Sequence, residues 1–202
     1  MNKFVAIVGS NSQKSTNRDL LKYMKRHFQS KAEIELVEIS GLPLYKKTPD
    51  EFVPQEALDI AKKIEASDGV IIATPEYDHS IPAVLSSALA WLSYGIHPLV
   101  DKPVMITGAS YGSLGSSRAQ AQLRQILDSP EIKARIMPSS EFLLGHSLQA
   151  FDEDGNLKDK KVVEQLDGLF QDFLQFVNIA KQLNNANDVN KQKAEEFSWD
   201  KD

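Results

Sequence analysis

The fold of this chain is decided by residues 3–16, which read KFVAIVGSNSQKST. Residues 4–8 are apolar and largely β-branched, as in a strand that is buried on both faces of a sheet. A polar loop follows from Gly9 to Thr16, and then apolar side chains recur at helical spacing from Asn17 to Phe28. A strand, a polar loop and an amphipathic helix in succession predict the first half of a βαβ unit.

The same alternation continues along the chain. Further strands are expected at 34–39, 70–73, 104–107 and 134–144, with helices over 55–66, 82–93 and 117–127 and a long closing helix over 159–183. Strands and helices that alternate at this spacing predict a parallel sheet covered on both faces. We therefore expect one doubly wound α/β domain over residues 1–183, followed by a polar, mobile tail over 184–202.

The composition excludes several classes of function. The chain has 202 residues, 42% of them apolar and 25% charged, which is an ordinary balance for one globular domain. A net charge of −5 does not attract nucleic acid or an anionic membrane. The absence of cysteine excludes disulfides, thiol redox chemistry and cysteine-ligated zinc, so redox chemistry would need a cofactor. We expect no metal site, and no leader precedes the first strand, so we expect a cytoplasmic protein.

Three loops follow the carboxyl ends of strands, which is where open parallel sheets bind their ligands. The first, residues 9–16, surrounds a helix N-terminus with hydroxyl and amide side chains, and this composition suits a phosphate. Lys14 and Arg18 add positive charge. The alternative is a polar turn that only caps its helix.

The second loop, residues 74–82, reads TPEYDHSIP. Tyr77 is a large aromatic side chain at the end of a strand, where a planar ring system would be a natural partner. The alternative is that Tyr77 is a lid over the core. His79 is either a capping or surface residue or a catalytic one.

The third loop, residues 107–116, reads TGASYGSLGS, and its glycines allow a ligand to approach the backbone closely. It also fits the nucleophile elbow G-x-S-x-G, with Ser110 as the nucleophile and His146 downstream. Against this, the glycine-rich stretch continues to Gly115 instead of turning directly into a helix. The glycine motif of short-chain dehydrogenases fits less well still, because the last glycine here is one residue late.

Together, the three loops resemble the NADPH-dependent FMN reductase family, over about residues 3–183. The family's first loop reads G-S-x-R-x-x-S-x-N, and the residues that match it here are Gly9, Ser10, Ser15 and Asn17, with Ser12 in place of the arginine. The family's P-E-Y-N segment corresponds to Pro75-Glu76-Tyr77-Asp78, and its R-A-Q-x-Q-L-R segment corresponds to 118–124. The family includes reductases of quinones, azo dyes and chromate.

This resemblance implies a three-layer flavodoxin-like fold with strand order 2-1-3-4-5 and FMN bound across the three loops. The phosphate would lie on the first loop and the isoalloxazine ring between the other two. The residues expected to bind FMN are Ser10, Ser12, Lys14, Ser15, Asn17, Pro75, Glu76, Tyr77, Asp78, Ser110, Tyr111 and Gly112. Lys14 would replace the family arginine, and Asp78, in place of asparagine, would bring a carboxylate near the ring. Arg118 would either meet the phosphates of the nicotinamide cofactor or form an interface salt bridge.

The expected activity is transfer of a hydride from NADH or NADPH to FMN, and then of electrons to a small acceptor such as a quinone, an azo compound, free flavin or a metal oxyanion. No side chain is expected to be catalytic. The alternatives are a serine hydrolase using Ser110 and His146, and a non-enzymatic electron carrier like flavodoxin. A homodimer or homotetramer is expected through the helix over 82–93, because this helix is apolar on more than one face and the resemblance implies dimers with this region at the interface.

Overall fold

The computed structural model describes residues 1–48, 52–138, 141–183 and 187–196. Its sheet is parallel and consists of β1 (Asn2–Val8), β2 (Ala32–Glu38), β3 (Gly69–Ala73), β4 (Pro103–Ala109), β5 (Arg135–Ile136) and β6 (Phe142–Leu144). The strand order is β2-β1-β3-β4-β5, which confirms the predicted order. The last predicted strand, 134–144, is two short strands that both pair with β4.

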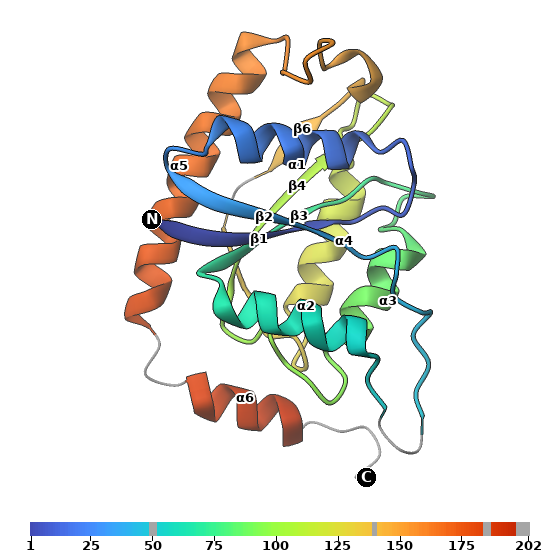
Figure 1. Cartoon of the computed structure of the whole chain (residues 1–202), viewed down its shortest axis with the longest axis vertical. Coiled ribbons are helices and arrows are strands. Elements are labelled where there is room, and N and C mark those ends of the chain that lie inside the picture. Colours follow the sequence, from blue (N-terminus) through green and yellow to red (C-terminus); the bar gives the residue numbers. More distant parts are fainter. Residues whose placement is uncertain (49–51, 139–140, 184–186, 197–202) are drawn as a thin grey trace.

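Helices cover both faces of the sheet and make three layers (Figure 1). The helices α1 (Thr16–His27) and α5 (Lys160–Gln182) pack on one face, and α2 (Gln55–Ala66), α3 (Ala83–Trp91) and α4 (Ser117–Leu127) pack on the other. The alternation along β1 divides the core in two, because Phe4 faces α5 while Val5 faces the opposite layer. Phe4 meets Phe170 edge-on at 6.0 Å between ring centroids, and Phe170 stacks on Phe28 at 3.7 Å.

The segment after β2 returns along α3 and covers the apolar surface that led us to expect an oligomer. The Trp91 indole Nε1 donates a hydrogen bond of 2.8 Å to the Pro43 carbonyl. The ring of Tyr45 lies edge-on to Trp91 at 4.9 Å, and its backbone N–H donates to the Ser87 hydroxyl. Trp91 is 2% exposed within the single chain. The leucine and tryptophan side chains of α3 are therefore buried within the single chain, so they are not in themselves evidence for an oligomer.

The segment expected to be a mobile tail contains a further helix, α6 (Asn187–Glu196), which packs against the body of the domain. The Asn190 side chain donates to the Asp101 carboxylate at 2.7 Å and accepts from the Lys133 ammonium at 2.9 Å. Ala194 is 1% exposed. The polar composition of this segment led us to expect no attachment to the domain, but the helix attaches mainly through polar contacts. Phe197 and Trp199, the two aromatic residues of the tail, lie outside the described residues.

Within the described ranges, no helix has both the length and the apolar character that a bilayer crossing requires.

Candidate functional site

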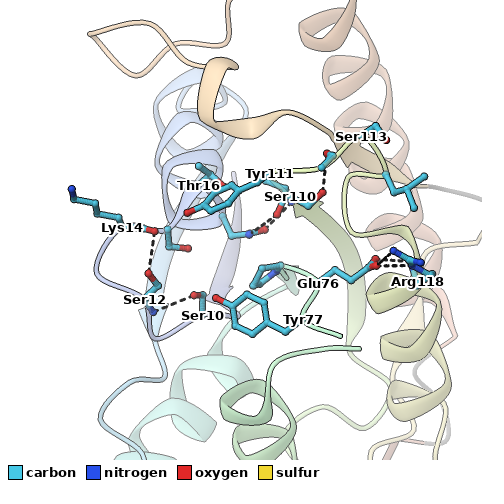
Figure 2. Close-up of a pocket in the computed structure, with 16 residues that line it drawn as sticks. Ser10, Ser12, Lys14, Thr16, Glu76, Tyr77, Ser110, Tyr111, Ser113 and Arg118 are labelled. Carbon is cyan, nitrogen blue, oxygen red and sulfur yellow. Dashed lines mark hydrogen bonds and ion pairs between the residues drawn. The ribbon is translucent and has the colours of Figure 1, made fainter. Parts of the chain in front are cut away.

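The three loops meet at the carboxyl edge of the sheet around a pocket of about 470 Å³ (Figure 2). Arg118 and every residue expected to bind the cofactor, with the exception of Asp78, line this pocket. Sequence reasoning missed four lining residues, which are Thr16, Ala109, Ser113 and Leu114. All four belong to the first and third loops or adjoin them, so the sequence predicted the right loops but not these individual residues.

The first loop presents hydroxyl groups and backbone N–H groups at the N-terminus of α1. Ser15 is the N-cap residue, and its hydroxyl accepts the Arg18 N–H at 3.4 Å. The buried Ser10 hydroxyl accepts the Ser12 N–H at 3.2 Å, which curls the loop. Among the described residues, the backbone N–H groups of 13–17 have no hydrogen-bond acceptor. Unpaired donors at a helix N-terminus suit a phosphate.

Asn17 joins the first loop to the third instead of pointing an open amide at a ligand. Its side chain is 2% exposed. Its Nδ2 donates to the Ala109 carbonyl at 2.9 Å, and its Oδ1 accepts the Ala109 N–H at 2.9 Å. A hydrogen bond of 2.8 Å between the Thr16 and Ser147 hydroxyls ties the end of the first loop to the segment after β6. Because Oδ1 and Nδ2 of Asn17 both bond to Ala109, the side chain positions the loop, and its expected contact with the phosphate stays a prediction.

Lys14 lines the pocket, and Figure 2 shows its side chain extending outward from the loop. Its carbonyl accepts the Ser12 hydroxyl at 3.1 Å. The ammonium group has no ion-pair partner within the described ranges. The prediction that it replaces the family arginine stays a prediction.

The second loop makes a tight turn that carries Asp78 away from the pocket. Tyr77 and Ser80 exchange two backbone hydrogen bonds, of 3.0 and 2.9 Å. The two residues between them are both left-handed, with φ of 49° at Asp78 and 66° at His79, the pattern of a type I′ turn. A short acidic or amide side chain tolerates this conformation, which accounts for Asp or Asn at position 78. Asp78 does not line the pocket, whereas Tyr77 forms its wall and is 49% exposed.

Glu76 completes the N-terminus of α4. Ser116, at the N-cap position, is left-handed with φ of 68°, and its side chain makes no capping hydrogen bond. The Glu76 carboxylate accepts the backbone N–H groups of Arg118 at 3.1 Å and Ala119 at 3.5 Å, and also Nε of Arg118 at 2.6 Å. Burial raises the pKa of Glu76, but these hydrogen bonds outweigh burial and bring the pKa below its ordinary value. Glu76 is therefore an ionised capping group.

Arg118 is paired with residues of its own chain. Beyond its bonds to Glu76, its Nη1 donates to Nε2 of His79 at 2.8 Å. Because a guanidinium only donates hydrogen bonds, Nε2 of His79 is the acceptor in this contact. His79 therefore supports Arg118 at the rim of the pocket, where the Arg118 side chain remains 45% exposed.

The third loop passes close to the core and then opens into the pocket. A Cβ on Gly108 would lie 2.6 Å from the Thr74 carbonyl and 2.8 Å from Nε2 of Gln120, so no side chain fits there. Tyr111 and Leu114 are 58% and 51% exposed. Figure 2 shows Tyr111 and Tyr77 reaching the pocket from opposite sides.

The geometry does not support a serine hydrolase. The Ser110 hydroxyl donates to the Gly112 carbonyl at 3.2 Å. His146 lines a separate pocket of about 370 Å³, beside the start of α5. Within the described residues, no hydrogen bond joins the Ser110 hydroxyl and the His146 ring. The nucleophile and its base are therefore not assembled.

Comparison with known proteins identifies the family. Residues 2–149 match the model of the NADPH-dependent FMN reductases. The chain belongs to this family. It is 55% identical over 196 residues to the NADH:(hydroxy)cinnamate reductase subunit CrdA of Vibrio ruber, a match that covers 97% of this chain and 96% of that protein. It is 42% identical over 186 residues to the NADH-dependent flavin reductase subunit 2 of Lactobacillus johnsonii, covering 89% and 99%.

The fold is also similar to that of a solved flavoenzyme of the same type. The NAD(P)H:(acceptor) oxidoreductase FerB of Paracoccus denitrificans superimposes with a TM-score of 0.79 at 28% identity, over 89% of this chain and 99% of that one. Family and fold confirm the expected oxidoreductase with FMN as cofactor and NAD(P)H as co-substrate. The residues of the pocket fit this cofactor, because the first loop offers hydroxyl and N–H donors for a phosphate and the second and third loops offer aromatic rings for a flavin.

Proposed function

We propose that FMN binds with its phosphate at the N-terminus of α1 and its ring between the second and third loops, and that NAD(P)H and a quinone-like acceptor use the open side of the pocket in turn. When bound, FMN takes a hydride from NAD(P)H and passes electrons to the acceptor. The observation that carries this proposal is the chemical division of the pocket. The first loop contributes the hydroxyl groups of Ser10, Ser12, Ser15 and Thr16, and the second and third loops contribute Tyr77, Tyr111 and Leu114.

The exposed side chains of the second and third loops favour planar, apolar acceptors. Tyr77, Tyr111 and Leu114 are each about half exposed, which is costly for large apolar side chains unless a ligand covers them. A quinone reductase of Escherichia coli is 32% identical over 182 residues, with 88% of this chain and 96% of that protein covered. Its name and those of the other relatives support a quinone or another conjugated aromatic compound as the acceptor.

The protein's own residues bind and orient in this proposal, and none transfers an essential proton. Glu76 is ionised and committed to three donors, and His79 accepts from Arg118. Neither is placed to exchange a proton with a ligand without losing these bonds. The exposed side of Arg118 is the proposed contact for the phosphates of the nicotinamide cofactor, and the ammonium of Lys14 is a second cation for the phosphate of FMN.

The names of two relatives favour a partner protein as an additional acceptor. Both CrdA and the Lactobacillus johnsonii protein are named as subunits. We propose that this chain is likewise the NAD(P)H-oxidising subunit of a larger reductase in the cytoplasm. A homodimer or homotetramer stays a proposal that rests on the family resemblance. Light scattering of the purified chain, alone and after co-expression with candidate partners, tests both kinds of assembly.

The proposed function is tested by the colour of the protein and its response to NAD(P)H. The purified protein is expected to be yellow and to release FMN on denaturation. Under anaerobic conditions NADH or NADPH should bleach the flavin absorbance, and benzoquinone should restore it. A colourless protein that does not take up added FMN would contradict the proposal, as would bound FMN that neither nicotinamide cofactor reduces.

A further inference from the structure

Arg18, on the first turn of α1, does not line the pocket, although the sequence led us to count its charge toward the phosphate. Its Nε and Nη2 donate to the two oxygens of Glu38, the last residue of β2, at 2.6 and 2.8 Å. This bidentate geometry is the strong form of an arginine–carboxylate pair. The Arg18 side chain is 16% exposed and that of Glu38 is 43% exposed. The positive charge is thus neutralised beside the loop by a glutamate of the neighbouring strand.

The remaining nitrogen of Arg18 contacts the phosphate loop itself. Its Nη1 donates to the Ser12 carbonyl at 2.8 Å and to the Gln13 carbonyl at 3.3 Å. Two successive carbonyl groups of the loop therefore point toward one guanidinium group. Ser12 and Lys14 line the pocket, whereas Gln13 and Arg18 do not, so the guanidinium lies on the side of the loop that faces away from the pocket.

The direction of these carbonyls fixes the direction of the next N–H groups. No peptide bond of the described chain is cis, and in a planar trans peptide the C=O and the following N–H point in opposite directions. The N–H groups of Gln13 and Lys14 therefore point away from Arg18. Both have no acceptor among the described residues. They are donors held in place in advance of a ligand, and such preorganisation favours binding.

We propose that Arg18, held by Glu38, is a positioning residue that turns the N–H groups of Gln13 and Lys14 toward the phosphate of the flavin and so makes the pocket select FMN over unphosphorylated riboflavin. This inference rests on the proposed place of the phosphate at α1. It also explains how the loop functions with Ser12 where the family motif has an arginine. Instead of an arginine at position 12, the loop has the guanidinium group of Arg18 on its outer side, where it orients the backbone N–H groups.

The test is a titration of flavin-stripped protein with FMN and with riboflavin, followed by quenching of flavin fluorescence. Arg18→Met keeps the length of the side chain and removes every donor. FMN affinity is expected to fall by about tenfold to a hundredfold, because two charge-assisted hydrogen bonds lose their geometry. Riboflavin affinity is expected to change by less than about twofold. Arg18→Lys should not restore FMN binding, since one ammonium cannot reach Glu38 and two carbonyls at once.

The matched control is Arg26→Met on the same helix. Arg26 donates to the Asp154 and Gly155 carbonyls, at 3.3 and 2.8 Å, and does not line the pocket. Its loss should leave the affinities for both flavins unchanged. Equal losses of FMN and riboflavin affinity in Arg18→Met would overturn the proposal and reduce the residue to a packing role.

Glu38→Gln distinguishes two roles of Arg18, orientation of the loop and electrostatic attraction of the phosphate. The change should leave the fold intact, because Glu38 is on the surface. If Arg18 positions the loop, this change weakens FMN binding by about threefold. If Arg18 acts only as a positive charge near the phosphate, loss of the neutralising carboxylate strengthens FMN binding or leaves it unchanged, and either result overturns the proposal. Wild-type protein that does not prefer FMN over riboflavin would instead refute the phosphate site itself.

Discussion

The N-termini of α1 and α4 lie at the same edge of the sheet, but only that of α4 is completed by an anion of the protein. At α4 the protein supplies the anion, because the Glu76 carboxylate accepts its first N–H groups. At α1 the cap is the neutral hydroxyl of Ser15, and the N–H groups of 13–17 lack an acceptor among the described residues. A helix N-terminus favours a negative charge. This difference supports the proposal that the phosphate of the flavin binds at α1.

The two arginines at these termini, Arg18 and Arg118, also differ in their position relative to the pocket. Each is paired with a glutamate from another segment, Arg18 with Glu38 and Arg118 with Glu76. Arg18 uses its last nitrogen to orient loop carbonyls outside the pocket, whereas Arg118 keeps an exposed side on the pocket rim. Positive charge in a loop sequence therefore does not show which face of the loop carries it.

Placing a carboxylate of the protein at the N-terminus of α1 should abolish the difference between the two termini. We expect it to have the largest effect on FMN affinity. Aspartate is as good an N-cap as serine, so Ser15→Asp should fold. Its carboxylate would repel the phosphate, by about 4 kcal/mol for unit charges 4 Å apart at an effective dielectric constant of 20. FMN affinity should fall by at least about a hundredfold, and riboflavin affinity should change little. Flavin titration measures both, and an equal loss for the two flavins would show that the pocket was simply distorted.

Breaking the tie between the two loops should affect both flavins alike. Asn17→Ala leaves the buried N–H and C=O of Ala109 without their side-chain partners, at a cost of about 2–4 kcal/mol in the free energy of unfolding. Urea denaturation measures this loss. FMN and riboflavin should weaken by similar factors, because the Asn17 amide is bonded to Ala109. A loss confined to FMN would show that this side chain reaches the phosphate after all.

Removing the charge at α4 should have a smaller effect on stability. Glu76→Gln retains an oxygen acceptor but loses the ion pair with Arg118 and the favourable interaction with the helix dipole. The free energy of unfolding at neutral pH should fall by about 1 kcal/mol. Thermal or urea denaturation of both proteins without flavin decides this. Glu56→Gln, an exposed acidic residue in the first turn of α2, is a matched control and should cost less.

The same pair of proteins gives a prediction with a defined sign in pH. The pKa of Glu76 is lower in the folded state than its ordinary value of 4.5, so its contribution to stability is fully present above that value. The contribution is lost as the pH falls through the folded pKa. The stability difference between wild type and Glu76→Gln should therefore be constant near neutrality and shrink below about pH 4. A difference that persists unchanged at acid pH would mean that the ionised carboxylate is not the stabilising form.

Changes in the turn after Glu76 should have the smallest effect. Asp78→Asn and His79→Gln should each change the rate of flavin reduction by less than about tenfold, because an essential general acid or base typically contributes about 10²–10⁴. Glu76→Gln should remain in the same range if FMN stays bound. Stopped-flow mixing of the FMN-loaded variants with NADH or NADPH measures these rates. A hundredfold loss with full FMN occupancy would give one of these side chains a part in proton transfer.

Sequence reasoning located the pocket because its signals are local. The apolar run of β1 followed by a polar loop, and the glycines after β4, mark strand ends that a parallel sheet must bring together. The roles of individual residues depended on partners that no spacing reveals. Asn17 bonds to Ala109, 92 residues away, and Glu76 reaches Arg118, 42 residues away. Asp78 was predicted to line the pocket for a different reason. The left-handed turn that directs it outward contains no glycine, which is the usual sequence signal for such a turn.

The relative affinity of wild-type protein for FMN and riboflavin tests the central claim most directly. The two ligands differ only in the phosphate, which we propose is bound by the unpaired donors of α1. Titration of flavin-stripped protein should show FMN binding at least about a hundredfold more tightly than riboflavin, as two or more charge-assisted hydrogen bonds would give. Equal affinities would show that the N-terminus of α1 does not bind the phosphate, and would contradict the account.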